Sequence, residues 1–227
     1  AAIHTYIRNT STREISRTLV RVERELLKVL PAGTALILTG TPRVIQLHME
    51  SFAQSQAVSL LFSAITVWFI VSLMFLSIFI GSLAMLPLLF TIVFSLGIMG
   101  LTGTPLDAAT VLVASISVGV GIDYSIHFIE RVKYELKSGN SLERASNKAS
   151  RTAGRAILIN AVTLISGFSI LAFSNFLTVS AFGIMMTFTM AASSVAALVI
   201  IPAILNSRRL GDRILKVFLR TDTKEPG

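Results

Sequence analysis

The sequence of 227 residues contains no cysteine, so it offers no disulfide framework, no thiol chemistry and no cysteine-bound zinc site. Its three histidines, His4, His48 and His127, lie far apart and lack the spacing of metal ligands. The sequence also shows no nucleophile–base pair, phosphate-binding glycine loop or set of metal-binding side chains. We therefore expect neither an enzyme nor a protein with a bound cofactor.

Charge is scarce as well, at 14% of residues, and the mean hydropathy is +0.75. No Lys, Arg, Asp or Glu occurs in the 56 residues between Glu50 and Asp107, or in the 52 residues between Arg155 and Arg208. About 20 apolar residues cross the hydrocarbon core of a bilayer, so each stretch holds two crossings. The chain is predicted to be an integral membrane protein. Its net charge of +8 then indicates headgroup contact near the spans, and no nucleic-acid partner.

The pattern predicts five transmembrane helices, at about residues 57–80, 83–101, 106–129, 156–173 and 180–204. Turn residues separate them, namely Gly81-Ser82, Thr102 to Pro105 and Asn175 to Thr178. Pro105 suits the first position of a helix. Asp107, three residues after Thr104, is then explained as part of a helix cap.

Residues 1–54 are predicted to form a different kind of unit outside the bilayer. Ile3–Ile7 and Ala35–Leu38 read as short strands, and apolar residues at helical spacing between Thr12 and Val29 predict an amphipathic helix. This is a βαβ-like piece, and two strands cannot close a core by themselves. The predicted fold is therefore an all-α bundle of five transmembrane helices, preceded by a small α+β piece.

The distribution of basic residues predicts the orientation. The loop 130–155 holds seven Lys or Arg against three Glu, and the tail 208–227 holds six basic against three acidic residues. Basic segments favour the cytoplasmic side, so we place both there and residues 1–54 on the opposite side. Within the loop, residues 142–153 also fit a short amphipathic helix lying on the membrane surface.

Asp123 is the most informative residue, because it lies inside the third predicted span, 15 uncharged residues after Asp107. An ionised carboxylate at such depth costs several kcal/mol, from about 3 upward, unless it is paired, hydrated or protonated. An apolar environment disfavours the charged form, so such a group can bind and release protons near neutral pH. Its alternative role is a hydrogen bond between packed helices.

Asp123 shares a helix face with Ser115, Gly119 and His127, which repeat at intervals of four residues. The small residues allow a neighbouring helix to approach closely. His127 lies nearer the end of the span, where an interfacial or structural role is favoured over chemistry. In the fourth span, Asn160, Thr163 and Gly167 share a face that either lines the surroundings of Asp123 or mediates helix packing.

The segment from Gly119-Val120-Gly121-Ile122-Asp123-Tyr124 to His127-Phe128 resembles the fourth-helix motif of resistance-nodulation-division (RND) transporters. The resemblance is greatest to the branch of lipid and hydrophobe exporters that includes the MmpL-like, hopanoid-exporter and Patched-like proteins. Thr163, Gly167-Phe168 and Phe182-Gly183 are similar to the fifth and sixth helices of that family, and Leu38 to Pro42 to the end of its extracytoplasmic porter domain.

The resemblance implies that the chain is the C-terminal part of one half of such a transporter, with transmembrane helices two to six in the inner membrane. Asp123 would then carry the proton, Tyr124 and His127 would shape its access, and Gly121 would join the small residues that pack around it. It implies as partners membrane lipids, a second half or another protomer, a periplasmic protein and a hydrophobic substrate. The alternatives are a lipid sensor similar to sterol-sensing domains and, third, a translocation accessory similar to SecD and SecF.

Overall fold

The computed structural model describes residues 12–31, 36, 41–103 and 108–222, and every regular element in these ranges is a helix. The helices are α1 (Thr12–Val29), α2 (Thr41–Met74), α3 (Ile78–Thr102), α4 (Ala108–Lys137), α5 (Leu142–Leu171), α6 (Leu177–Leu205) and α7 (Arg208–Asp222). Four of them are long and apolar enough to cross a membrane, namely α3, α4, α5 and α6. The stretch Val58–Met74 of α2 is a fifth apolar helix of 17 residues. The predicted membrane bundle of helices is thus confirmed.

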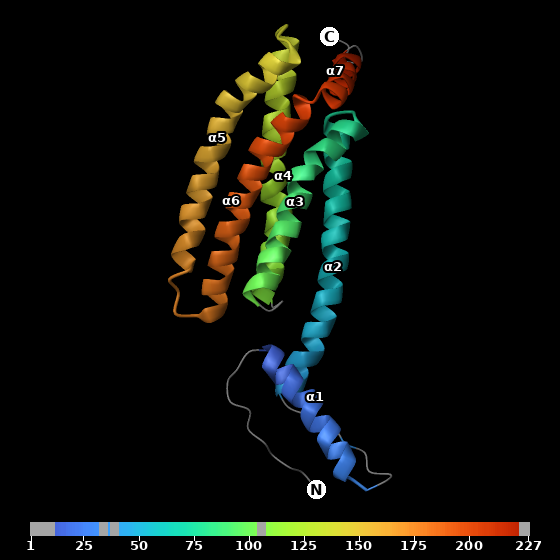
Figure 1. Cartoon of the computed structure of the whole chain (residues 1–227), viewed down its shortest axis with the longest axis vertical. Helices are drawn as coiled ribbons and strands as arrows, with labels where there is room; N and C mark the ends of the chain where they lie inside the picture. Colours follow the sequence, from blue (N-terminus) through green and yellow to red (C-terminus); the bar gives the residue numbers. More distant parts are fainter. Residues whose placement is uncertain (1–11, 32–35, 37–40, 104–107, 223–227) are drawn as a thin grey trace.

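Successive helices from α2 to α6 run in opposite directions, as Figure 1 shows. The α2–α3 turn, the α4–α5 turn and α7 lie at one end of the bundle, and α1 lies beyond the other end (Figure 1). We call the first of these the α7 end. The segments 130–155 and 208–222, whose excess of basic residues predicts one side of the membrane, therefore lie at the same end.

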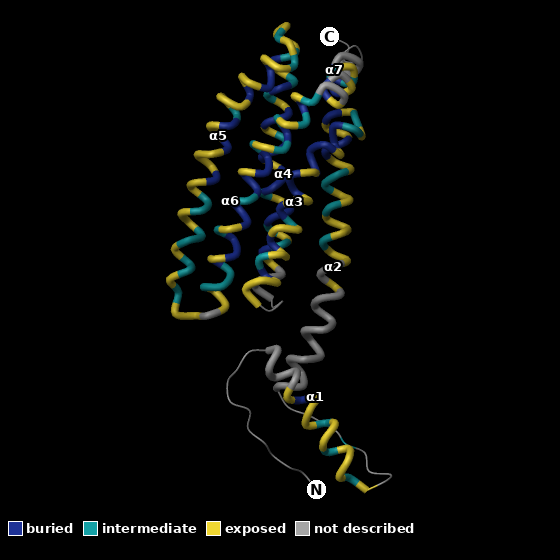
Figure 2. The backbone as a smooth tube through the Cα atoms, in the orientation of Figure 1, coloured by how far each residue is buried: buried dark blue, intermediate teal, exposed yellow. Residues whose placement is uncertain are grey.

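Helix α6 forms the centre of the bundle, because it packs against α3, α4 and α5. Small side chains make this close contact possible, and those of Ser193, Ser194, Ala196 and Ala197 are all buried. A hydrogen bond of 3.2 Å between the buried hydroxyls of Ser95 and Thr189 links α3 to α6. Buried residues gather where these helices face one another, and exposed ones cover the outer sides (Figure 2).

The predicted βαβ-like piece is not supported. Its helix is present as α1, but no strand occurs among the described residues. The predicted strand Ile3–Ile7 lies outside the described residues, and so does Ala35–Leu38 apart from Leu36, which belongs to no regular element. Asp107 and Pro105 also lie outside them, whereas Gly103 ends α3 in the left-handed region (φ 68°), as expected of a turn residue.

The turn between α2 and α3 was predicted at Gly81-Ser82, and that position is wrong. Helix α2 ends at Met74, and α3 begins at Ile78 with Ser77 as its N-cap. Gly81 lies inside α3, where any side chain would collide with Ser72 of α2. Close packing just after the turn requires this glycine, while Leu76 supplies the positive φ (49°) of the turn itself.

The helix predicted to lie on the membrane surface is instead the first part of α5. Residues 142–153 continue without a break into the membrane-crossing stretch, and Ala145 and Ala149 are buried against the bundle. A helix of 30 residues is about 45 Å long, more than the ~30 Å hydrocarbon core. The α4–α5 hairpin therefore carries its charged residues on helices that extend past the membrane. The basic tail likewise contains a helix, α7, which buries Ile214 and Phe218.

Candidate functional site

The outer face of α4 carries the four residues that the sequence placed on one stripe. Ser115, Gly119, Asp123 and His127 are all exposed on the surface of the bundle. A side chain added at Gly119 would meet nothing within 4 Å. The predicted common face is therefore present, and the described part of the chain leaves it uncovered.

Asp123 lies at the middle of α4, 15 residues after Ala108 and 14 before Lys137. At 1.5 Å per residue it is roughly 20 Å from either end of the helix. Among the residues that the structure describes, no hydrogen bond or ion pair is formed by its carboxylate. An acid in this position needs a covering surface, a bound proton or water, because a lipid-facing charge within the hydrocarbon core is disfavoured.

Two further residues of the motif, Gly121 and Tyr124, lie on the inner face of α4. A Cβ at Gly121 would lie 3.0 Å from the Ser193 Oγ of α6 and 3.3 Å from the Leu88 Cδ1 of α3. Gly121 thus packs inside the bundle, against α3 and α6. Tyr124 is 1% exposed, and its hydroxyl has no hydrogen-bond partner in the described part of the chain.

Tyr124 and His127 meet Asn160 of α5 at a cleft between α4 and α5. Of the predicted residues on α5, only Asn160 lines this cleft. The Thr163 hydroxyl donates to the Ile159 carbonyl oxygen at 2.9 Å, within its own helix. Gly167 is exposed, with no neighbour within 4 Å of a Cβ placed there. The structure therefore brings Tyr124, His127 and Asn160 together, while Thr163 and Gly167 lie on the exposed surface of α5.

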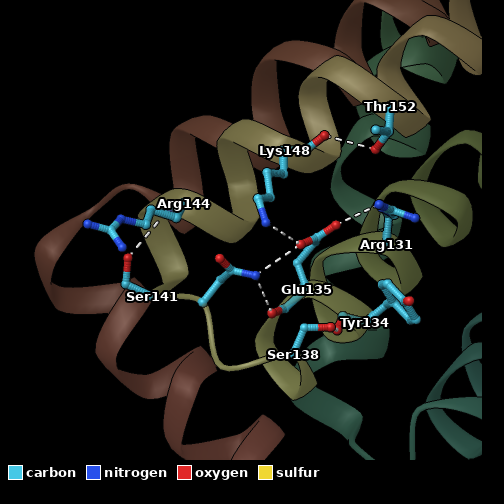
Figure 3. A network of polar contacts seen from close by, with 9 residues as sticks. Arg131, Tyr134, Glu135, Ser138, Ser141, Arg144, Lys148 and Thr152 are labelled. Atoms are coloured by element: carbon cyan, nitrogen blue, oxygen red, sulfur yellow. Dashed lines mark hydrogen bonds and ion pairs between the residues drawn. The ribbon is translucent and has the colours of Figure 1, made fainter.

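Sequence reasoning missed Glu135, the centre of a polar network near the α4–α5 turn (Figure 3). Its carboxylate accepts hydrogen bonds from Arg131 Nη2 at 2.6 Å and from Asn140 Nδ2 at 3.0 Å, and Lys148 Nζ of α5 lies 3.2 Å away. The Glu135 side chain is only 6% exposed. The spacing of four residues between Arg131 and Glu135 was the available signal, since such pairs meet on a helix surface. This network joins the two helices of the hairpin next to the cleft.

Comparison with known proteins identifies the chain at this point. The family model for the MMPL family matches residues 4–216, which is nearly the whole chain. The chain belongs to the MMPL family. The resemblance of its Gly119–Phe128 segment to RND transporters of the MmpL-like branch is thus supported by a match that includes the entire bundle.

Two relatives are named only as membrane proteins. MJ1562 of Methanocaldococcus jannaschii is 32% identical over 138 residues, which are 61% of this chain and 36% of the relative. YdgH of Bacillus subtilis is 29% identical over 166 residues, which are 69% of this chain and 18% of the relative. The match therefore spans about a third of one relative and less than a fifth of the other. Neither name specifies a substrate.

Proposed function

We propose that this MMPL-family chain is part of a proton-driven exporter of hydrophobic or lipid-like molecules. The observation that carries the proposal is the position of Asp123, at the middle of α4 and on its uncovered face. A carboxyl group held there can couple two states of a helix bundle to the binding and release of a proton. Tyr124 and His127 follow it on α4 and line the neighbouring cleft, and in this proposal they shape the access of protons to the acid.

The uncovered stripe favours a second half of the transporter, or another protomer, as the covering partner. Ser115 and Gly119 present little more than backbone over two helical turns, which is the surface that membrane helices use for close approach. A partner packed there would remove Asp123 from lipid and supply its counter-charge or hydrogen bonds. Protonation would then weaken the attraction across this interface, and alternating access would follow from movement of one half against the other.

The distribution of charge supports a cytoplasmic position for the α7 end. Residues 130–155 and 208–227, with their excess of Lys and Arg, are the segments that the positive-inside rule retains in the cytoplasm. Residues 1–54 would then lie on the extracytoplasmic side of an inner membrane. The hydrophobic class of substrate rests on the MMPL family and on the resemblance to lipid exporters.

The test uses the intact protein that contains this chain, expressed in cells loaded with the hydrophobic dye N-phenyl-1-naphthylamine. Energising the cells should start dye export, and an uncoupler should stop it. At matched membrane levels, we expect Asp123→Asn to lower the energised export rate at least about tenfold, to the rate in uncoupled cells. Asp123→Glu, which keeps a titratable group, should retain part of the activity.

Glu143→Gln is the matched control, because Glu143 is an exposed carboxylate in the first turn of α5, far from the stripe along the chain. It should export at the wild-type rate. Undiminished gradient-dependent export by Asp123→Asn would contradict the role of Asp123 as proton carrier. Lipid binding without any gradient-dependent export by the wild type would instead favour the sensor similar to sterol-sensing domains.

A further inference from the structure

Helix α5 is the most exposed of the four helices that are long and apolar enough to cross a membrane. Buried residues make up 17% of its most apolar stretch, against 44–50% in α3, α4 and α6. The helix lies at the edge of the bundle, where it packs against α4 and α6 (Figure 1). Most of its surface is therefore in contact with the surroundings of the bundle.

The outward face of α5 is basic in its first half. Four basic residues recur there at intervals of four, three and four positions, so they share one helix face, and all are exposed, namely Arg144, Lys148, Arg151 and Arg155. We call these four residues the basic face. Buried residues such as Ser146 and Ile157 lie on the opposite side of the helix. The one acidic residue in 142–155, Glu143, lies about 100° around the helix from Arg144.

Acidic residues offset only a small part of this charge. The Lys148 Nζ lies 3.2 Å from the buried Glu135 carboxylate of α4. The exposed Glu130 of α4 lines the cleft next to Ala153 and Ile157, on the side of α5 away from the basic face. Within the described part of the chain, no ion pair is formed by Arg144, Arg151 or Arg155. The basic face thus keeps three positive charges without a carboxylate partner among the described residues.

Beyond Arg155 the outward face of α5 becomes apolar. At least half of each side chain is exposed at the large apolar residues that continue it, namely Leu158, Ile159, Val162 and Ile170. No charged residue follows Arg155 in this helix. The 16 residues from Ala156 to Leu171 span about 24 Å, which is less than the ~30 Å hydrocarbon core. Arg155 therefore lies at the edge of the core, where its side chain can extend into the headgroup layer.

The size of the apolar side chains indicates what covers this face. Bulky Leu, Ile and Val side chains are typical of helix surfaces in contact with acyl chains, whereas small residues are typical of close contact between membrane helices. The face of α4 with Ser115 and Gly119 is of the second kind. The outward face of α5 is of the first kind, so its basic half lies at the level of lipid headgroups.

From these observations we propose that the basic face binds anionic phospholipids of the leaflet at the α7 end, with Arg151 and Arg155 on their phosphate groups. A headgroup layer is roughly 5–8 Å thick, and Arg151 is only about 6 Å farther along the helix than Arg155. Both guanidinium groups can therefore donate paired hydrogen bonds to phosphate oxygens. Arg144, about 16 Å beyond Arg155, adds to the attractive field. Binding needs no proton gradient, so it is independent of the proposed export.

The experiment measures which lipid lies next to α5. The chain contains no cysteine, so Leu158→Cys in an otherwise cysteine-free intact protein attaches one fluorophore to the exposed apolar face below Arg155. The protein is placed in vesicles of equimolar phosphatidylglycerol and phosphatidylcholine, with a spin-labelled quenching chain on one lipid or the other. Phosphatidylglycerol should quench more strongly. Arg151→Gln and Arg155→Gln should each lower this local preference about fivefold. Lysine at either position should retain part of it, because the charge remains.

Arg24→Gln is the matched control, because it removes one exposed basic side chain from α1, beyond the other end of the bundle. It should keep the wild-type preference. A fluorophore at Val93→Cys, on the exposed surface of the uncharged helix α3, should be quenched equally by the two lipids. Equal quenching by the two lipids at position 158 would overturn the proposal, and so would a preference that persists when both arginines are replaced by glutamine. Weak quenching by either lipid there would show that protein covers this face, which would also overturn it.

Discussion

On the inner face of α4, the Glu135 carboxylate is buried and interacts with Arg131, Asn140 and Lys148. On the outer face, twelve residues earlier, Asp123 is exposed and has no such partner among the described residues. The first carboxylate is satisfied within the chain, so its role is to hold α4 against α5. The second can be satisfied only by something that the described residues do not supply. One helix thus combines a structural acid with an acid available for function.

The largest difference between the two carboxylates should appear in stability. Glu135→Ala leaves Arg131, Lys148 and the Asn140 amide without their common acceptor. We expect a loss of about 3 kcal/mol, below the upper range for buried ion pairs because the two cations are partly exposed. For a chain of this size, the midpoint of thermal unfolding in detergent should fall by roughly 6–12 °C.

Asp123→Ala and Glu143→Ala are the comparisons for this loss. Each should change the midpoint by less than about 2 °C, because neither carboxylate is bound within the described part of the chain. Circular dichroism at 222 nm measures all three variants. Equal midpoints for Glu135→Ala and Asp123→Ala would remove the distinction between a structural and an available acid.

The inner and outer faces of α4 can also be compared by placing a large side chain at Gly121 or at Gly119. Gly121→Leu introduces a large side chain where even a Cβ lies 3.0 Å from Ser193 Oγ, so it should lower stability by about 2 kcal/mol. Gly119→Leu meets open space and should leave the unfolding midpoint of this chain unchanged. In the intact protein, however, Gly119→Leu should lower dye export, because it obstructs the covering partner. Full export by a stable Gly119→Leu variant would argue against a partner at this face.

The sequence predicted the membrane helices well because a soluble protein of this size does not leave stretches of 56 and 52 residues without charge. It failed at the α2–α3 turn, where Leu76 adopts a positive φ that sequence rules assign to glycine, while Gly81 serves helix packing instead. A tight turn and the close packing of two helices both favour glycine, so the residue type alone does not say which of them a glycine serves. Only the distance between α2 and α3 distinguishes them.

The sequence predicts which residues share a helix face with Asp123, but not what lies next to that face. Helical spacing placed Asp123 with Gly119 and His127 on one stripe, yet spacing cannot say whether a stripe faces a neighbour or the outside. Glu135 was missed because its segment was interpreted as a charged loop, in which each residue counted only toward topology. Its partner Lys148 comes from α5, 13 residues later in the chain, and that contact depends on how the hairpin folds.

The smallest predicted effect concerns Tyr124, which is buried like the inner face but lines the open cleft. Tyr124→Phe should not lower the free energy of unfolding, because its hydroxyl has no hydrogen-bond partner to lose in the described part of the chain. Ser95→Ala, which removes a hydroxyl bound to Thr189, should lose about 1 kcal/mol. A loss for Tyr124→Phe as large as that for Ser95→Ala would show that the Tyr124 hydroxyl is satisfied within the protein.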